Sequence, residues 1–406
     1  RSAVGKGRQE ADEANKPAEV EAIEAFLFSQ AEFRHNVITH HCEIRWTEEA
    51  GFLPLTDRDV NTLWGRMNKT VGRVYLTDIY NVIHSEFVPL FNPFQSYFDH
   101  LPSWDGVSDP IGDLADTVHV KSDQAEFRDY FRKWFVGILP ALLDDTVVNH
   151  EILVLIGEQG LYKTTWFNFL LPPELRCYFY TKTNSDRLNK DDLFSLTEFA
   201  LICFEELDGM RPAELNQLKA MVTMPYVNER AAYGRNKERH PHIASFCGTG
   251  NNVQFLTDPT GNRRWLPFEV SQIRDPHLHA IPYELVYSQA YALWKSGFCH
   301  WFSQEEIRVL NTHNSRFEVP NLEEDLIRTH FRKPFEGEAG IFVTAADILE
   351  QISSCLRYPL SPNKIGRIMA GLEFESIRYK GKRGYITVKK TGEDIDRERR
   401  SGALGL

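Results

Sequence analysis

The chain has 406 residues, of which 42% are hydrophobic, and a formal net charge of −11. This length and apolar content predict two or three folded domains and exclude a largely disordered protein. The acidic charge excludes a protein that coats duplex DNA over a broad basic face, so any contact with nucleic acid must be local.

The cysteines and the apolar runs indicate the cellular setting. The six cysteines are scattered and include no CxxC pair, which argues against a zinc ribbon or a disulfide framework and favours a reducing cytoplasm. No run of 18 apolar residues occurs, so no transmembrane helix or membrane partner is expected. The polar start lacks a signal core, and because the first residue is Arg1, we expect the chain to begin inside a longer protein or after a tag.

The first part of the chain is predicted to be helical. Residues 1–18 read as a disordered tail. Residues 19–92 are expected to form a helical domain, because apolar residues recur at helical spacing and the segments from Thr56 and Leu76 begin with cap-like patterns. The segment 91–106 is rich in proline and aromatic residues and is interpreted as the junction with the next domain.

Apolar strands then alternate with helices across residues 93–300, which predicts a three-layer α/β domain. Residues 301–390 are expected to form a C-terminal domain. Within it, a helix, a second helix capped by Ser361 and a β-ribbon predict a winged-helix-like unit over 341–389. Residues 391–406 are expected to be a disordered tail.

A phosphate-binding loop is predicted after the apolar strand Ile152–Ile156. GEQGLYKTT, residues 157–165, follows this strand and leads into an apolar helical segment. In such a loop, backbone N–H groups bind phosphate oxygens, the lysine reaches the β- and γ-phosphates, and the next hydroxyl ligates Mg²⁺. The expected nucleotide-binding residues are Gly157, Gln159, Gly160, Leu161, Tyr162, Lys163, Thr164 and Thr165, with Thr164 also a Mg²⁺ ligand.

Tyr162 departs from the usual loop pattern, which has glycine before the lysine. Tyrosine adopts φ > 0 only at a cost in free energy. We therefore expect either φ < 0 or local strain at this position. If the ring points away from the nucleotide, the substitution is harmless. A strand, a turn and a helix with a chance Lys-Thr pair is the alternative interpretation.

Two acids end the next apolar strand, ALICFEE, residues 200–206. An NTPase needs one acid near Mg²⁺ and another that orients the attacking water. Adjacent carboxylates at a strand tip diverge, so they can supply both. We assign Glu205 to Mg²⁺ and Glu206 to the catalytic base, with Asp208 as a weaker candidate. The alternative is a pair of surface acids that cap the following helix.

An amide and two arginines follow along the chain. Asn251, or its neighbour Asn252, ends the strand IASFCGTGN, where it would position water beside the γ-phosphate. Arg263 and Arg264 stand in TGNRRW, and arginine stabilises charge on a transferring phosphoryl group. Either arginine could act in its own subunit or at a neighbour's nucleotide. A turn asparagine and ordinary surface arginines are the alternatives.

Two short stretches concentrate positive charge. Residues 228–242, NERAAYGRNKERHPH, could bind nucleic-acid phosphates from the inner wall of a ring, with Tyr233 stacking on a base. RYKGKRGY, residues 378–385, could contact a DNA backbone from the wing of the C-terminal unit. Solvated polar loops are the alternative for both. The basic side chains concerned are Arg230, Arg235, Lys237, Arg239 and His240 in the first stretch, and Arg378, Lys380, Lys382 and Arg383 in the second.

Together these motifs resemble the virulence-associated protein E family over roughly residues 90–270. The resemblance rests on GEQGLYKTTW, FEELDGM, YGR and FCGTGNNVQFLTDPTGNRRW in this order, with FNPFQSYFDHLPSWDG upstream. The family consists of ATPases encoded by phages and mobile elements, similar to superfamily-three helicases and primase-helicases. The resemblance implies an AAA+-like P-loop core between the helical region and the winged-helix-like unit.

The implied activity is an ATP- and Mg²⁺-dependent DNA helicase or translocase of a phage or mobile element, in the bacterial cytoplasm. Such proteins often form hexameric rings that hydrolyse ATP between subunits. The implied partners are single-stranded or forked DNA and a primase domain or replication protein. In such helicases a hairpin between the acidic strand and the asparagine strand contacts DNA. That role falls here on Arg235, Lys237, Arg239 and His240, and the arginine finger stays open among Arg230, Arg235, Arg263 and Arg264.

Two other functions stay open. A regulatory or defence ATPase would use ATP to control oligomerisation without translocation, which the acidic charge and the modest basic content of 228–242 favour. A non-enzymatic DNA-binding module would rest on the C-terminal unit alone. No catalytic acids of a primase are recognisable, so any priming domain is expected upstream of this chain.

Overall fold

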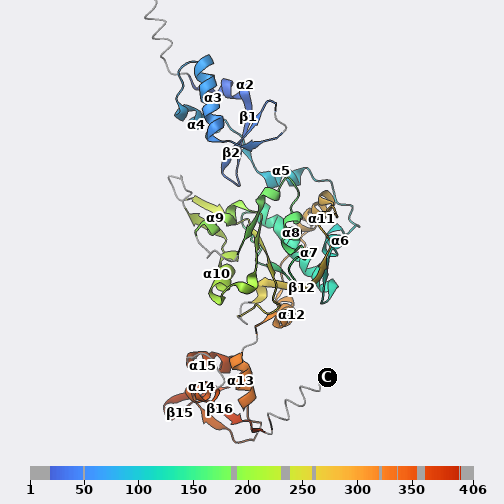
Figure 1. The fold of residues 1–406 in the computed structure, drawn as a ribbon, viewed down its shortest axis with the longest axis vertical. Helices are drawn as coiled ribbons and strands as arrows, with labels where there is room; N and C mark the ends of the chain where they lie inside the picture. Colours follow the sequence, from blue (N-terminus) through green and yellow to red (C-terminus); the bar gives the residue numbers. More distant parts are fainter. Residues whose placement is uncertain are drawn as a thin grey trace, which may run out of the picture. The chain divides into compact units, whose positions relative to one another are not determined.

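The chain has a mixed α/β fold and divides into two compact units, Arg1–Glu318 and Val319–Leu406 (Figure 1). The computed structural model describes residues 19–48, 51–183, 190–229, 238–257, 262–319, 322–335, 337–353, 362–392 and 394. The predicted tail 1–18 and nearly all of 391–406 lie outside these residues. Among the described helices, none is both long and apolar enough to cross a bilayer.

Residues 19–92 surround an apolar core of their own, to which Leu27, Leu63 and Ile79 contribute. The expectation of a helical domain is corrected in part, because residues 31–46 form an antiparallel hairpin within a four-stranded sheet. Burial alternates at the start of β1, where Ala31 and Phe33 are buried and Glu32 between them is exposed, a period of two that a helix does not have. The elements are α2 (Val20–Gln30), β1 (Ala31–Asn36), β2 (His41–Trp46), β3 (Leu53–Pro54), α3 (Asp57–Thr70), α4 (Leu76–Ile83) and β4 (Leu90–Phe91).

A six-stranded sheet forms the centre of the first unit. Five of its strands run parallel, and β5 pairs antiparallel at one edge. All side chains of β6, β8 and β11 are buried, as expected for strands covered on both faces. The order across the sheet is β5 (Val118–Val120), β12 (Trp265–Ile273), β6 (Ile152–Ile156), β11 (Ser245–Gly250), β8 (Leu201–Phe204) and β7 (Phe179–Lys182).

Each face of this sheet has its own apolar core. Leu153 and Leu155 of β6 join one core, whereas Ile152, Val154 and Ile156 join the other. Successive side chains of a strand point to opposite faces, so one strand contributes to both cores. The first core includes residues of α5 (Pro93–Asp99), α6 (Pro110–Ala115), α7 (Gln124–Leu143), α8 (Lys163–Leu170) and α11 (Tyr283–Lys295), and the second includes residues of α9 (Lys190–Glu198) and α10 (Pro212–Val222).

The helix α12 (Gln304–Asn314) belongs to the first unit. Leu310 is buried in the core beside the sheet, and Asn314 donates from Nδ2 to the Trp265 carbonyl at 3.0 Å. The unit therefore ends at Glu318, whereas the sequence analysis placed the boundary at residue 300. Short 3₁₀ turns complete this unit at Arg176–Tyr178 (η1), Leu207–Gly209 (η2), Asn262–Arg264 (η3) and Ser315–Phe317 (η4).

The second unit has the helix, helix and β-ribbon order that the sequence analysis expected of residues 341–389. Ile348 of the first of these helices and Ile365 of the second are buried in one core. The two ribbon strands pair antiparallel, and β14 pairs with the other edge of the second ribbon strand. Ser361, the expected cap, lies outside the described residues. The elements are α13 (Leu322–His330), β13 (Phe331–Arg332), β14 (Ile341–Val343), α14 (Ala345–Ser353), α15 (Pro362–Gly371), β15 (Ser376–Tyr379) and β16 (Lys382–Lys389).

Candidate nucleotide-binding site

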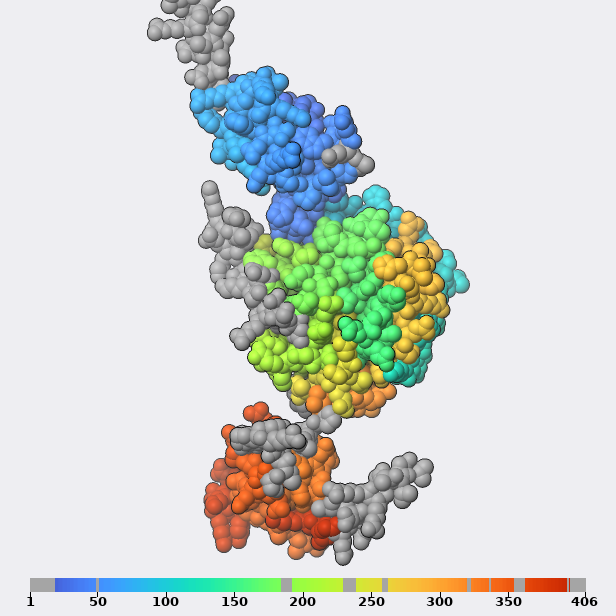
Figure 2. Space-filling model, in the orientation of Figure 1, coloured from blue at the N-terminus to red at the C-terminus, as the bar shows by residue number. Residues whose placement is uncertain are grey.

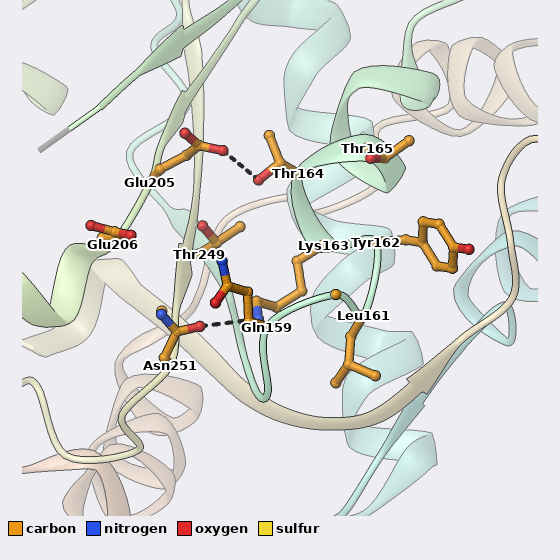
Figure 3. Close-up of a pocket in the computed structure, with 12 residues that line it drawn as sticks. Gln159, Leu161, Tyr162, Lys163, Thr164, Thr165, Glu205, Glu206, Thr249 and Asn251 are labelled. Atoms are coloured by element: carbon orange, nitrogen blue, oxygen red, sulfur yellow. Dashed lines mark hydrogen bonds between the residues drawn. The ribbon is translucent and has the colours of Figure 1, made fainter.

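A cavity of about 430 Å³ lies at the carboxyl ends of β6, β8 and β11 (Figure 3). Neighbouring parallel strands end at the same edge of the sheet, so three distant segments of the sequence meet there. The lining residues are Gln159, Gly160, Leu161, Tyr162, Lys163, Thr164, Thr165, Glu205, Glu206, Thr249, Gly250 and Asn251. The cavity therefore unites most of the predicted site residues, and adds Thr249 and Gly250, which the sequence analysis missed.

The loop between β6 and α8 is held close to its neighbouring strands. Gly157 donates its N–H to the Gly250 carbonyl at 3.1 Å. A Cβ at Gly157 would lie 2.9 Å from the Val270 carbonyl oxygen, so this position needs glycine. Gly160 adopts φ +90°, a conformation that glycine reaches without strain. The loop thus places the N-terminal turn of α8, whose first N–H groups lack helical partners, at the cavity.

Tyr162 lies in the left-handed region, with φ 60° and ψ 17°. Of the two expectations for this position, the structure shows the strained one. The strain amounts to about 1–2 kcal/mol for a residue other than glycine. The side chain is 42% exposed, and its ring points away from Glu205 and Asn251 in Figure 3. The loop therefore keeps the backbone shape that glycine normally provides.

Lys163 is only 8% exposed, and its ammonium group is surrounded by oxygen acceptors. Its Nζ donates to the carbonyls of Gly157 at 2.6 Å and Glu158 at 2.8 Å, and lies 3.5 Å from Oδ1 of Asn251. Burial lowers the pKa of Lys163, and the negative charge of Asp208 acts in the opposite direction. The loop therefore holds a cation at the cavity wall, where an anionic phosphate would compensate for its lost hydration.

Thr164 and Glu205 form the candidate magnesium site. The Thr164 hydroxyl donates to Oε1 of Glu205 at 2.8 Å. Oxygens of an octahedral Mg²⁺ shell lie at 2.0–2.1 Å from the ion, so adjacent ligands are about 2.9 Å apart. The separation in this pair fits that requirement. Across the described part of the chain, no cluster of three or more His, Cys, Asp or Glu side chains is placed to hold a metal ion.

Glu206 and Asp208 follow the end of β8 and have different surroundings. Glu206 lines the cavity with φ 54°, and a residue other than glycine in this conformation is strained, as often occurs at functional sites. Asp208 accepts hydrogen bonds from the backbone N–H groups of Asn251 and Asn252, each at 3.1 Å. It therefore holds the turn that presents Asn251 to Lys163. The sequence analysis named Asp208 as a weaker catalytic candidate and missed this positioning role.

Arg263 and Arg264 lie at the amino ends of the parallel strands, whereas the cavity lies at their carboxyl ends. Trp265, the next residue, is in register with Ile152 at the start of β6, whereas the candidate phosphate loop follows Ile156 at its end. Five residues of a strand span roughly 16 Å. Burial lowers the pKa of Arg264, the charge of Arg263 adds to this effect, and Glu151 opposes it. Neither arginine lines the cavity of its own chain.

An antiparallel hairpin, β9 (Tyr226–Glu229) and β10 (Glu238–Pro241), stands between the acidic strand and the asparagine strand. The Arg239 guanidinium carbon lies 3.4 Å from the centroid of the Tyr226 ring. The His240 ring lies 4.8 Å from the ring of His40, at the β1–β2 turn. The other basic residues predicted to act here, Arg230, Arg235 and Lys237, lie outside the described residues.

A comparison with protein families gives a match over residues 99–319 to the virulence-associated protein E-like domain. The chain belongs to this family. The matched range contains the whole cavity, so the resemblance inferred from the motifs is confirmed. A search of curated proteins finds no match to this virulence-associated protein E-like chain.

Solved structures similar to this family member are distant. The apo structure of the NrS-1 C terminal region shares 12% identity with a TM-score of 0.47, and covers 91% of this chain and 98% of that one. A mutant of RuvB from Thermotoga maritima shares 10% identity with a TM-score of 0.25, covering 67% of this chain and 94% of that one. Similarities at these scores carry no inference about activity.

Proposed function

We propose that this virulence-associated protein E-like chain is an ATP-dependent DNA helicase or translocase. The observation that carries the proposal is the convergence of Lys163, the Thr164–Glu205 pair and Asn251 on one cavity at the carboxyl ends of neighbouring strands. A phosphate loop, a magnesium site and a polar group beside the lysine are the parts that nucleoside triphosphate hydrolysis requires.

Each residue has a role that follows from its position. Lys163 and the N–H groups at the start of α8 would bind the β- and γ-phosphates. Thr164 and Glu205 would hold Mg²⁺, which neutralises charge on these phosphates when bound. Glu206 would accept a proton from the attacking water, and Asn251 would orient that water. Asp208 would hold Asn251 in place by accepting the hydrogen bond that the Asn251 backbone N–H donates.

The position of the arginines supports hydrolysis between subunits. Arg263 and Arg264 lie across the sheet from their own cavity, so they would reach a nucleotide only in a neighbouring copy. A head-to-tail interface would bring the amino ends of the strands in one subunit to the carboxyl ends in the next. Repeating this interface produces a closed ring when the rotation between neighbouring subunits is a whole fraction of a turn. We propose that one of these arginines stabilises the γ-phosphoryl charge of the neighbouring subunit, and that the ring is a hexamer.

The hairpin β9–β10 is proposed to bind the single-stranded or forked DNA that such a ring would move along, through Arg239, His240, Arg235 and Lys237. DNA phosphates would attract the cations of the hairpin. The stacking of the Arg239 guanidinium on the Tyr226 ring, 3.4 Å from its centroid, supports this proposal because bound strands are held by basic and aromatic side chains together. A primase domain or replication protein is the proposed further partner.

Mixing two inactive variants tests the shared site. Lys163→Ala removes the phosphate-binding cation, and Arg263→Ala with Arg264→Ala removes the arginines. Each variant alone should hydrolyse ATP at a background rate. Mixed subunits should regain activity, because an interface between them can pair an intact lysine with an intact arginine. If the mixture stays at background while both variants assemble and exchange subunits, the trans assignment is wrong.

A regulatory ATPase that controls oligomerisation without translocation is the second candidate. The observation in its favour is that Arg239 and His240 contact Tyr226 and His40 of their own chain. The triple variant Lys237→Gln, Arg239→Gln and His240→Gln distinguishes the two functions. A motor would lose stimulation of ATP hydrolysis by DNA, whereas a regulatory ATPase would assemble and hydrolyse ATP as before.

A further inference from the structure

The second unit concentrates positive charge on one helix and one ribbon. From α15 to the end of β16, residues 362–389, the sequence has seven Lys and Arg against two Glu, in a chain whose net charge is −11. Lys364 of this segment pairs with Glu323, whereas Glu324 and Glu338 pair with Arg328 and Arg332, outside the segment. The segment is therefore a local basic surface on an acidic protein, and Figure 2 shows the red-coloured part that contains β15 and β16 on the surface of this unit.

Two arginines oppose each other on the ribbon. Arg378 of β15 is in register with Arg383 of β16, so their side chains leave the same face of adjacent strands. Like charges directly opposite each other destabilise an antiparallel pair. Nε of Arg383 donates to the Ser376 hydroxyl at 2.8 Å, which fixes the direction of one guanidinium group. Within the described residues, neither arginine forms an ion pair, so the fold itself does not compensate for this repulsion.

The arginine pair shares a face with α15. Side chains alternate along β16, so Tyr385 and Arg383 leave the same face. The Tyr385 hydroxyl donates to the Gly366 carbonyl of α15 at 3.2 Å, which places that helix on this face. Tyr379 contacts Phe342, ring centroids 5.4 Å apart, on the opposite face. The arginines therefore continue the surface of α15, about 7 Å further along the ribbon than Tyr385.

α15 exposes a row of three side chains beside this pair, two of which, Asn363 and Arg367, are polar. Asn363, Arg367 and Ala370, spaced four and three residues apart, are exposed, whereas Ile365, Ile368 and Met369 are buried. The B-form major groove admits an α-helix, and this spacing places the three residues on one face of the ten-residue helix α15. Asparagine and arginine are side chains that recognise base edges there, and the first turn of such a helix makes most of these contacts.

We propose that the second unit binds duplex DNA, with α15 in the major groove and the β15–β16 ribbon on the adjacent backbone. Arg378 and Arg383 contact phosphates, which relieves their mutual repulsion, and Asn363 and Arg367 face the base edges. The narrow major groove of A-form RNA does not admit a helix, so the surface favours DNA. This binding does not depend on the nucleotide cavity.

The test uses the full chain and a labelled blunt duplex of about 20 base pairs, roughly two helical turns, without nucleotide. Fluorescence anisotropy at several salt concentrations gives the dissociation constant and its salt slope, and a single strand of the same length is measured in parallel. The variant is Arg378→Gln with Arg383→Gln. The matched control is Arg328→Gln with Lys333→Gln, because both residues belong to the same unit and form exposed ion pairs.

The double variant should bind the duplex about tenfold more weakly for each arginine, with a salt slope reduced by about 2, while the control changes far less. Its thermal midpoint should equal or exceed that of the wild type, which shows that lost binding is not misfolding. Lys163→Ala should keep duplex binding, so failure of the proposed ATPase leaves this inference intact. Duplex affinity that matches the wild type overturns the proposal. So does an equal loss of single-strand binding, which would assign the ribbon to single strands.

Discussion

Substitution of Tyr162 by glycine is predicted to stabilise the protein, whereas substitution by glycine usually destabilises a fold. A residue other than glycine at φ 60° carries about 1–2 kcal/mol of strain, and Tyr162→Gly removes it. Glycine lowers the free energy of unfolding by about 0.5–1 kcal/mol, because it loses more conformational entropy on folding than other residues do. The ring is 42% exposed, so little apolar burial is lost. The balance is a gain between zero and about 1.5 kcal/mol, or a rise of up to roughly 2 °C in the midpoint of the first unit.

Tyr75 provides the matched control. It also precedes a helix, with a ring 47% exposed, but its φ is −87°. Tyr75→Gly relieves no strain, so it should lower the midpoint by the same entropic effect. Thermal unfolding with and without ATP and Mg²⁺ measures both variants. The reasoning fails if Tyr162→Gly lowers the midpoint as Tyr75→Gly does. A loss of ATP affinity in Tyr162→Gly would instead show that the ring contacts the nucleotide.

Three other changes test the site and its support. Thr164→Ala should raise the Mg²⁺ concentration needed for half-maximal ATP hydrolysis by about tenfold or more, while Thr165→Ala on the same turn changes it little, and equal effects would remove Thr164 from the metal site. Asp208→Ala should lower kcat by about tenfold to a hundredfold, because it removes the hydrogen bonds that hold Asn251 and its neighbour in place; an unchanged kcat would contradict the positioning role. Burial lowers the pKa of His242 to about 4, so its stabilising effect is complete above pH 6.5 and is lost as the pH falls towards 4. Urea unfolding should show this loss of stability in the wild type and much less of it in His242→Asn. Asparagine keeps a donor for the Met224 carbonyl, whose oxygen lies 2.6 Å from Nδ1 of His242.

Local motifs predicted the parts of the site that lie within one turn of the chain. The candidate phosphate loop and the acids after β8 could be predicted because a strand, a turn and a few polar residues suffice to suggest them. The Asp208–Asn251 contact joins residues 43 apart and depends on β8 and β11 being neighbours, which no local pattern reveals. The position of Arg263 and Arg264 depends likewise on the register of β12 against β6.

The fold shows the same limit. The hairpin at residues 31–46 was missed because short strands with polar residues resemble the helical segments around them. The assignment of α12 to the first unit depends on a few buried contacts, among them the 2.7 Å separation between Nε2 of His313 and the Pro267 carbonyl oxygen. Such contacts join distant segments and leave little trace in the polar sequence of the helix itself.

The central claim is that the cavity around Lys163 hydrolyses ATP in a cycle coupled to DNA. Steady-state ATP hydrolysis by the assembled protein, measured with and without single-stranded DNA, tests it most directly. The account predicts a rate that DNA stimulates and that Lys163→Ala abolishes in both conditions. An ATP hydrolysis rate that is the same with and without DNA would contradict it.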